Sequence, residues 1–153
     1  MERLHQVQLE ILKDADALCR KHGLNYFVSG GTAIGAIRHQ GFIPWDDDID
    51  LVMLREDYDK FVQIAPKWLK EDLVLQTVYT EKNYLRGHAQ IRNSKTCGCN
   101  EEDKKAGYNC GIFIDIFPLD GMPSNIFALK VHQFRLALAR LMYQDRKSTR
   151  LNS

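Results

Sequence analysis

The sequence predicts an α+β (α/β) fold in which helices flank a small mixed β-sheet. Apolar residues recur at the 3.6-residue spacing of helices in some segments and at the two-residue spacing of strands in others, and the two patterns alternate. Helices that alternate with strands usually cover the faces of one sheet. The 153 residues, of which 44% are hydrophobic and 27% charged, suffice for one globular domain with a sizeable core.

The first part of the chain predicts two helices that flank a short strand. Apolar residues at helical spacing predict a first helix over residues 2–21, and Gly23 provides the stop signal. The β-prone run 26–28 predicts a strand. Helical spacing resumes over residues 32–38, and the glycine and proline of residues 41–45 predict a loop.

The middle of the chain predicts three strands and one helix. Acidic and aliphatic residues alternate over residues 48–53, as in a half-buried strand. A helix is expected over 55–69, with Pro66 kinking or shortening it. Residues 73–79 and 88–92 are the further strands expected in this region.

The last part predicts a loop, a strand and a long helix. Residues 93–109 are polar and read as a loop, whereas residues 112–117 form a strongly β-prone run that Pro118 should end. Apolar spacing then predicts a helix over residues 125–143.

Residues 145–153 do not continue that spacing and resemble a translated sequencing-adapter read. We therefore expect a domain at 1–144 that is truncated at its C-terminus, followed by a frayed, non-native tail at 145–153. The final helix should then lack its packing partners. A natural polar C-terminus is the alternative.

Overall charge and hydropathy exclude several classes of protein. The formal net charge of +1 does not indicate a general nucleic-acid or membrane binder. No run is long and apolar enough to span a bilayer, and the N-terminus has no apolar signal core. A cytoplasmic protein with reduced cysteines is expected. Cys97, Cys99 and Cys110 could bind zinc with His88, but their spacing misses the usual patterns and favours an ordinary loop.

Asp48 and Asp50 are the first candidates for chemistry. Side chains two apart on a strand point to the same face, so these carboxylates should project together while Ile49 and Leu51 enter the core. Two adjacent carboxylates repel each other unless a cation lies between them. Oxygen ligands favour Mg²⁺ or Mn²⁺, which usually also bind substrate phosphates.

A phosphate-binding turn precedes this strand. Gly30 and Gly31 lack Cβ atoms, so their backbone N–H groups can approach an anion, and a positive φ is expected at Gly31. Thr32 opens a helix whose N-terminus attracts negative charge and can add a hydroxyl hydrogen bond. Such a turn before an Asp-x-Asp strand predicts that the backbone amides and a carboxylate-bound metal bind the same phosphate group.

The acidic run has two other interpretations. Asp46, Asp48 and Asp50 occupy positions one, three and five of a calcium-binding loop, but Leu51 and Asp57 stand where that loop needs glycine and glutamate. A solvated acidic loop is the other alternative, which the alternation with aliphatic residues disfavours.

Asp115 is the third candidate acid. It lies between Ile114 and Ile116 in an apolar strand, where an unpartnered carboxylate is costly. A hydrogen-bonded aspartate at a strand end is the alternative.

The segment GGTAIGAIRHQGFIPWDDDID, residues 30–50, closely resembles the signature of the LicD family, which includes bacterial phosphocholine transferases and, more distantly, fukutin-related ribitol-phosphate transferases. REDY at 55–58 and IDIFPLD at 114–120 match further family blocks in the same order. The resemblance covers roughly the first 120 residues.

The resemblance implies a DNA-polymerase-β-like nucleotidyltransferase fold and a metal-dependent phosphotransferase. Asp48 and Asp50 match the family's metal-binding pair and Asp115 its third carboxylate, so these three are the expected catalytic residues. The implied donor is CDP-linked, typically CDP-choline, and the acceptor is a glycan or lipid-linked glycan, as in lipopolysaccharide or teichoic acid synthesis. An acceptor hydroxyl attacks the distal phosphorus and CMP leaves.

Residues around these acids receive secondary roles. Gly30, Gly31 and Thr32 should hold phosphate oxygens, and Arg38 either clamps a phosphate or complements the helix dipole. His39 is expected to pack or cap.

Trp45 is expected in the core, with base stacking as the alternative. Asp46 should support the metal ligands, and Asp47 should face away from Asp48.

Two other functions remain open at this point. The chain could transfer a nucleotide instead of the distal group, in which case pyrophosphate would be released. It could also be a non-catalytic metal- or nucleotide-binding module. The presence of all three acids argues against this alternative, because a binding module does not require the full set. No nucleic-acid partner is expected, and the protein would be cytoplasmic or peripheral at the inner membrane face.

Overall fold

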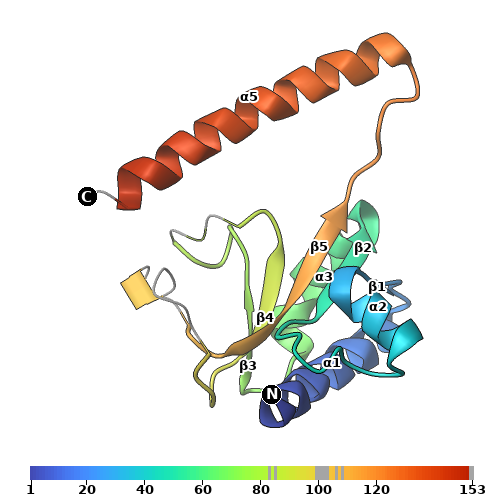
Figure 1. Cartoon of the computed structure of the whole chain (residues 1–153), viewed down its shortest axis with the longest axis vertical. Helices are drawn as coiled ribbons and strands as arrows, with labels where there is room; N and C mark the ends of the chain where they lie inside the picture. Colours follow the sequence, from blue (N-terminus) through green and yellow to red (C-terminus); the bar gives the residue numbers. More distant parts are fainter. Residues whose placement is uncertain (83, 85, 99–103, 106, 108, 152–153) are drawn as a thin grey trace. The chain divides into compact units, whose positions relative to one another are not determined.

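The computed structural model describes residues 1–82, 84, 86–98, 104–105, 107 and 109–151, and of the helix residues 143–151 only the backbone. The chain divides into two compact units, Met1–Leu119 and Asp120–Ser153. In chain order the helices and strands are α1 Glu2–His22, β1 Phe27–Val28, α2 Gly30–Arg38, β2 Asp50–Leu54, α3 Arg55–Trp68, β3 Leu73–Gln76, β4 Ala89–Asn93, β5 Ile112–Leu119 and α5 Ile126–Leu151 (Figure 1).

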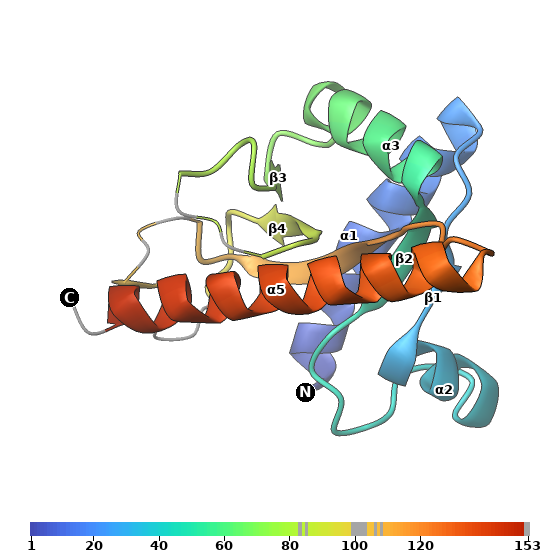
Figure 2. The same cartoon turned by 90° about the horizontal axis from the view of Figure 1, so that it is seen from above.

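The five strands form one mixed sheet in the order β1-β2-β5-β4-β3. Strands β2 and β5 run parallel, whereas the other neighbouring pairs are antiparallel. Figures 1 and 2 show β2 and β5 side by side at the centre of the first unit. The predicted α+β class with a mixed sheet is confirmed.

One face of the sheet forms the hydrophobic core with α1 and α3. Alternate residues of the central strands point into it, because side chains of a strand alternate between faces. The largest of these buried side chains are Leu51, Met53, Ile91, Ile114 and Ile116. Helix α1 ends as predicted, since Gly23 adopts a left-handed conformation with φ of 65°.

The opposite face of the sheet carries a row of polar residues, one from each of four strands. Asp50 is the Cα partner of Asp115, Asp115 that of Gln90, and Gln90 that of Gln76. Paired residues of neighbouring strands share a face. We call Asp50, Asp115, Gln90 and Gln76 the polar row.

Several predicted strand boundaries are wrong by a few residues. Strand β2 begins at Asp50 instead of Asp48, and β3 ends at Gln76 because Thr77 turns the chain through a hydrogen bond from its N–H to Thr80 Oγ1 (2.8 Å). Strand β5 continues through Pro118, whose register partner lies on β2 alone, so its missing N–H breaks no pairing with β4.

Helix boundaries differ as well. Helix α2 begins at Gly30, two residues before the predicted start, and α3 contains Pro66 and still extends to Trp68.

The second unit contains the long helix α5. Asn125 caps its start, because its Oδ1 accepts hydrogen bonds from the N–H groups of Phe127 (2.9 Å) and Ala128 (3.2 Å). The helix continues to Leu151, so the predicted end at residue 143 is wrong. The non-native tail at 145–153 stays a prediction, and its residues 152–153 lie outside the described residues. Large apolar side chains on it, such as Phe127 and Phe134, are exposed.

None of the described helices is both long and apolar enough to cross a lipid bilayer.

Gly35 allows the chain after α2 to fold back on the helix. A Cβ atom there would lie 2.5 Å from the carbonyl oxygen of Gly41, and the Gly41 N–H donates to the Gly35 carbonyl (3.3 Å). Substitution must therefore displace the backbone that leads to the acidic segment.

Gly35→Ala should lower the free energy of unfolding by about 1–3 kcal/mol, because the added methyl group overlaps backbone. Gly41→Ala is the matched control, since nothing lies within 4 Å of a Cβ there. Urea unfolding followed by circular dichroism measures both. Equal stabilities for the two variants would contradict this account of the turn.

Candidate metal and phosphate site

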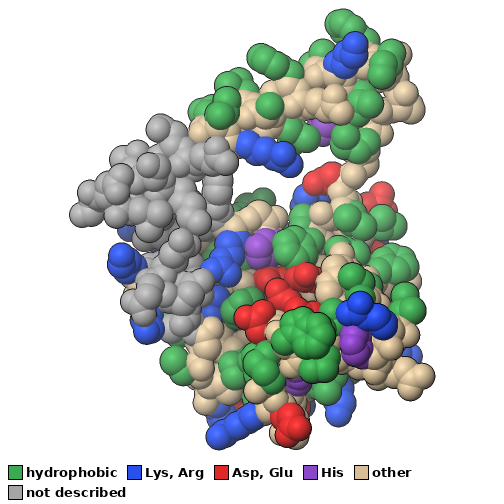
Figure 3. Space-filling model, in the orientation of Figure 1, with side chains coloured by type: hydrophobic (Ala, Val, Ile, Leu, Met, Phe, Trp, Pro, Cys, Tyr) green, Lys and Arg blue, Asp and Glu red, His purple; other side chains and the backbone are tan. Residues whose placement is uncertain are grey.

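Asp50 and Asp115 lie directly opposite each other on neighbouring parallel strands. Side chains at paired positions share a face, so the register brings together two acids that are far apart in sequence. The Asp115 N–H donates to the carbonyl of Ile49 (2.9 Å), which extends the pairing beyond the start of β2. Acidic side chains cluster at the centre of the first unit in the view of Figure 3.

Asp48 joins these acids from the loop before β2. A pocket of about 250 Å³ is lined by both Asp48 and Asp115. Burial, followed by the charges of Asp50 and its other acidic neighbours, raises the pKa of Asp48 to about 6. Burial and the charge of Asp115 also raise the pKa of Asp50. The three acids predicted from sequence therefore influence one another electrostatically.

Helix α1 holds the acidic loop through backbone atoms. His5 Nε2 lies 2.7 Å from the carbonyl oxygen of Asp46, and Gln8 Nε2 donates to the carbonyl of Asp47 (2.7 Å). The prediction that Asp47 faces away from Asp48 is wrong, since carboxylate oxygens of Asp46, Asp47 and Asp48 lie within 4.8 Å of one another. The physical reason is that this segment is a loop, to which strand alternation does not apply.

The glycine turn packs directly against the acids. Gly30 has a φ of 54°, and a Cβ atom there would lie 2.9 Å from Asp50 Oδ2. A Cβ at Gly31 would overlap Asp46 Oδ2. The prediction of a positive φ at Gly31 is wrong, because Gly30 adopts that conformation. Gly31 is instead restricted by its closeness to Asp46.

Thr32 connects the turn to the acidic strand. Its Oγ1 accepts a hydrogen bond from the N–H of Asp50 (2.9 Å), and the Ser29 N–H donates to the Asp50 carbonyl (3.0 Å). Thr32 therefore fixes the backbone that carries Asp50, while its hydroxyl proton can still be donated elsewhere.

Arg38 lies at the opposite end of α2, about 12 Å along the helix axis from Gly30 at 1.5 Å per residue. Its Nε lies 3.4 Å from His39 Nδ1. This position matches the helix-end role better than a clamp on a phosphate at the turn.

Trp45 is 74% exposed, so the expectation of a core tryptophan is wrong. It belongs to a surface turn and contacts the His39 ring edge-on, with 6.4 Å between centroids.

Sequence reasoning did not connect Gln90, Arg92 and His88, which lie on β4 or just before it, with the acids. Gln90 Nε2 donates to Asp115 Oδ1 (2.6 Å), and Arg92 donates to Gln90 Oε1 through Nε (3.2 Å) and Nη2 (2.8 Å). His88 Nε2 lies 3.1 Å from Asp115 Oδ1 without forming a hydrogen bond. Polar residues at every second position of 88–92 were the available signal, because they predict one polar face.

The zinc hypothesis gains nothing from the structure. Cys97 and Cys110 are free thiols, Cys99 lies outside the described residues, and His88 lies against Asp115.

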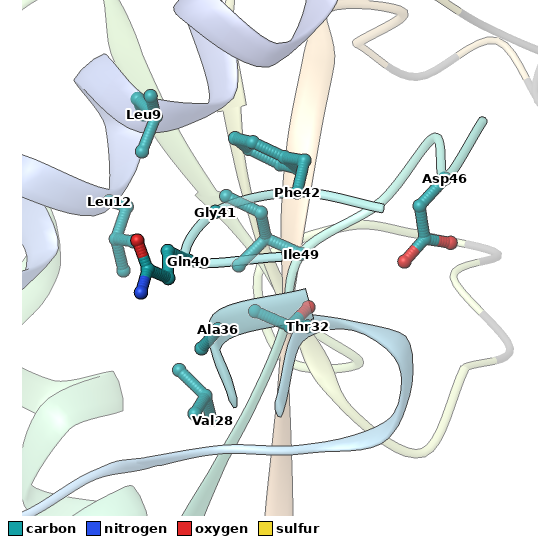
Figure 4. A pocket seen from close by; sticks show the side chains of 10 residues that line it. All are labelled: Leu9, Leu12, Val28, Thr32, Ala36, Gln40, Gly41, Phe42, Asp46 and Ile49. Carbon is teal, nitrogen blue, oxygen red and sulfur yellow. The ribbon is translucent and has the colours of Figure 1, made fainter. Parts of the chain in front are cut away.

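A larger, mostly apolar pocket of about 570 Å³ opens beside the acids (Figure 4). Two of its wall residues also belong to the acid site. Thr32 accepts the hydrogen bond from the Asp50 N–H, and Asp46 lies against Gly31. Its other wall residues come from α1, β1, α2 and the acidic loop, and they are Leu9, Leu12, Val28, Ala36, Gln40, Gly41, Phe42 and Ile49.

By their chemistry the donors of the site suit a divalent cation, and among the described residues the acids whose oxygens lie within 4.8 Å of one another are Asp46, Asp47 and Asp48. Asp48, Asp50 and Asp115 offer only carboxylate oxygens, and the raised pKa values of Asp48 and Asp50 express repulsion and burial that a bound cation would offset. Oxygen donors of this kind suit Mg²⁺ or Mn²⁺. The glycine turn adds backbone amides at the N-terminus of α2, where an anion is favoured.

Asp48 should make the stability of the metal-free protein depend on pH. Its folded pKa of about 6 exceeds the ordinary value of 3.8, so the folded state retains this proton more strongly. The resulting stabilisation is complete below pH 4 and lost as pH rises through about 6. Asp48→Asn cannot ionise and should therefore exceed the wild type in Tm at pH 8, by a few degrees, but not at pH 4.

Differential scanning fluorimetry in EDTA measures this difference, and Asp59→Asn, an exposed acid on α3, is the control. Added Mg²⁺ should raise the Tm of the wild type at pH 8 and raise that of Asp48→Asn less. A Tm difference that does not change with pH would contradict the raised pKa.

Comparison with known proteins identifies the family. The sequence profile described as "LicD/FKTN/FKRP, nucleotidyltransferase domain" matches residues 23–128. The lipopolysaccharide cholinephosphotransferase LicD of Haemophilus influenzae is 40% identical over 119 residues, which are 77% of this chain and 43% of that protein. The ribitol 5-phosphate transferase FKRP of Homo sapiens is 43% identical over 42 residues, 28% of this chain and 8% of that protein.

An uncharacterized protein of Rickettsia typhi is 42% identical over 59 residues, 39% of this chain and 19% of that protein. The chain thus spans less than half the length of these relatives. The profile match over most of the chain and the similarity to LicD show that this protein belongs to the LicD/FKTN/FKRP family.

Proposed function

We propose that this chain forms part of a metal-dependent transferase that moves phosphocholine from CDP-choline to a hydroxyl of a cell-surface glycan, with release of CMP. The observation that carries the proposal is the register of β2 and β5, which sets Asp50 opposite Asp115. Asp48 lines the same pocket as Asp115. Two relatives are named as a cholinephosphotransferase and a ribitol 5-phosphate transferase, so both transfer phospho-alcohol groups.

Each part of the site has a role in this reaction. Asp48, Asp50 and Asp115 would hold Mg²⁺, which supplies charge neutralisation at the transferring phosphoryl group. Gly30 and Gly31 pack against the carboxylates of Asp50 and Asp46, and their backbone amides at the start of α2 would bind phosphate oxygens. The amides of the turn and the carboxylate-bound Mg²⁺ would together hold the donor's diphosphate so that an acceptor hydroxyl can approach the distal phosphorus in line.

The pocket beside Thr32 and Asp46 gives space for the remainder of a substrate. Its volume lies within the ordinary range for ligand sites. Of its polar side chains, Thr32 and Asp46 adjoin the acids, whereas Gln40 lies beside Leu12 (Figure 4). The acceptor would then be a glycan or lipid-linked glycan on the inner face of the membrane, with the enzyme cytoplasmic or peripherally bound.

Changing Asp48, Asp50 or Asp115 to Asn should each reduce transfer about 10²-fold or more, because each change removes a charge from the metal site. Combined changes should cost little more than single ones, since the site fails as a unit. Asp47→Asn should be milder because Asp47 is exposed, and Asp59→Asn should be neutral.

Mass spectrometry measures the transfer with CDP-choline or CDP-ribitol, Mg²⁺ and a lipopolysaccharide acceptor. CMP is the expected product, and release of pyrophosphate from a nucleotide substrate would support nucleotide transfer instead. A fully active Asp50→Asn variant would refute the three-acid site.

Gly31→Val should lower the affinity for CDP-choline about tenfold or more, which corresponds to about 1.4 kcal/mol. The branched side chain would overlap the Asp46 carboxylate that packs against the turn and would therefore displace the turn. Calorimetric titration in the presence of Mg²⁺ measures the affinity. Gly121→Val is the control, because nothing lies within 4 Å of a Cβ there. Unchanged affinity in a folded Gly31→Val variant would exclude the turn from phosphate binding.

A further inference from the structure

Arg92 is a fully buried cation on the same face of the sheet as the acids. Its side chain is 0% exposed, and its guanidinium lies 4.5 Å from the ring centroid of Phe113. The guanidinium donates to Gln90 Oε1 through Nε (3.2 Å) and Nη2 (2.8 Å), and to the Gly111 carbonyl through Nη1 (3.1 Å). A buried guanidinium needs such acceptors, so its position is strongly determined.

This arrangement fixes the orientation of the Gln90 amide. Two N–H groups of Arg92 point at Oε1, and a flipped amide would place NH₂ against these donors. Nε2 must therefore point the other way, where it donates to Asp115 Oδ1 at 2.6 Å. Gln90 is itself 0% exposed, so water cannot replace either contact.

Asp115 consequently presents its two oxygens differently. Oδ1 accepts the Gln90 hydrogen bond and also lies 3.1 Å from His88 Nε2. Among the residues that the structure describes, no hydrogen bond falls on Oδ2. One oxygen is engaged and the other is left for a ligand beside Asp50.

We propose that the Arg92–Gln90 pair restricts Asp115 to single-oxygen coordination and thereby makes the acid site prefer Mg²⁺ to Ca²⁺. Mg²⁺ takes one oxygen from each of one or two carboxylates and keeps several waters. Ca²⁺ takes six to eight oxygens and commonly uses both oxygens of a carboxylate. Gln90 is thus a positioning residue for metal selectivity, and its role rests on the metal site of the proposed function.

Calorimetric titrations with MgCl₂ alone and CaCl₂ alone test the proposal without any substrate. Gln90→Met keeps the side-chain length but cannot donate to Asp115. It should weaken Mg²⁺ binding about tenfold, because loss of a residue that hydrogen-bonds to a metal ligand has an effect of this size. Ca²⁺ binding should be kept or strengthened. The ratio of the two dissociation constants should therefore shift about tenfold toward Ca²⁺.

Gln76→Met is the matched control. Gln76 is also 0% exposed and also belongs to the polar row, but it is one strand further from Asp115, and its amide has no hydrogen-bond partner in the described part of the chain. It should leave the Mg²⁺/Ca²⁺ ratio unchanged. Arg92→Lys is a second test, because lysine keeps the charge but cannot reproduce the two guanidinium hydrogen bonds to Gln90. It should shift the Mg²⁺/Ca²⁺ ratio in the same direction.

The outcomes separate the two proposals. A wild-type protein that binds Mg²⁺ but whose ratio is unchanged in a folded Gln90→Met or Arg92→Lys variant overturns the selectivity role and leaves the proposed function intact. Absence of Mg²⁺ binding to the wild type overturns the metal site itself. An equal ratio shift in Gln76→Met would show a general packing effect and also overturn the role of Gln90.

Discussion

The parallel pairing of β2 with β5 is the constraint on which the site depends, because it sets Asp50 beside Asp115. Two adjacent carboxylates oppose this register, whereas the other face of the same strands favours it. Leu51, Met53 and Ile116 are almost fully buried there. A slip of one residue would exchange the two faces and expose these side chains, so the hydrophobic core holds the acids together.

The polar row shows how the fold accommodates charge on a sheet that is apolar on its other side. Moving along the row from β2 toward β3, the side chains change from two half-buried acids to two fully buried amides. Arg92 is a buried positive group on this face, and Gln90 connects it to Asp115. The Gln90 amide hydrogen-bonds to both charged groups, so the position of the Arg92 guanidinium influences the orientation of the Asp115 carboxylate through these hydrogen bonds.

The sequence predicted those features that local spacing determines, namely the α+β class and the order of helices and strands. The assignment of Asp48, Asp50 and Asp115 as site residues stays a prediction. It could not predict that Asp50 and Asp115 are register partners, because register depends on packing between distant segments. Asp47 was misplaced because the loop before β2 does not follow strand alternation. Trp45 was misplaced because an apolar side chain in a loop does not by itself determine burial. Gln90 and Arg92 were missed because their roles depend on a neighbouring strand.

The contacts that fasten the acidic segment fall mainly on backbone atoms. His5 and Gln8 hold the carbonyls of Asp46 and Asp47, and Thr32 holds the N–H of Asp50. Carboxylates fastened through their own oxygens would have little capacity left for a cation. Holding the backbone instead fixes where each acid lies and leaves its oxygens available, which is what a preformed ligand site requires. Asp115 departs from this pattern at one oxygen only, and that departure makes its two oxygens inequivalent.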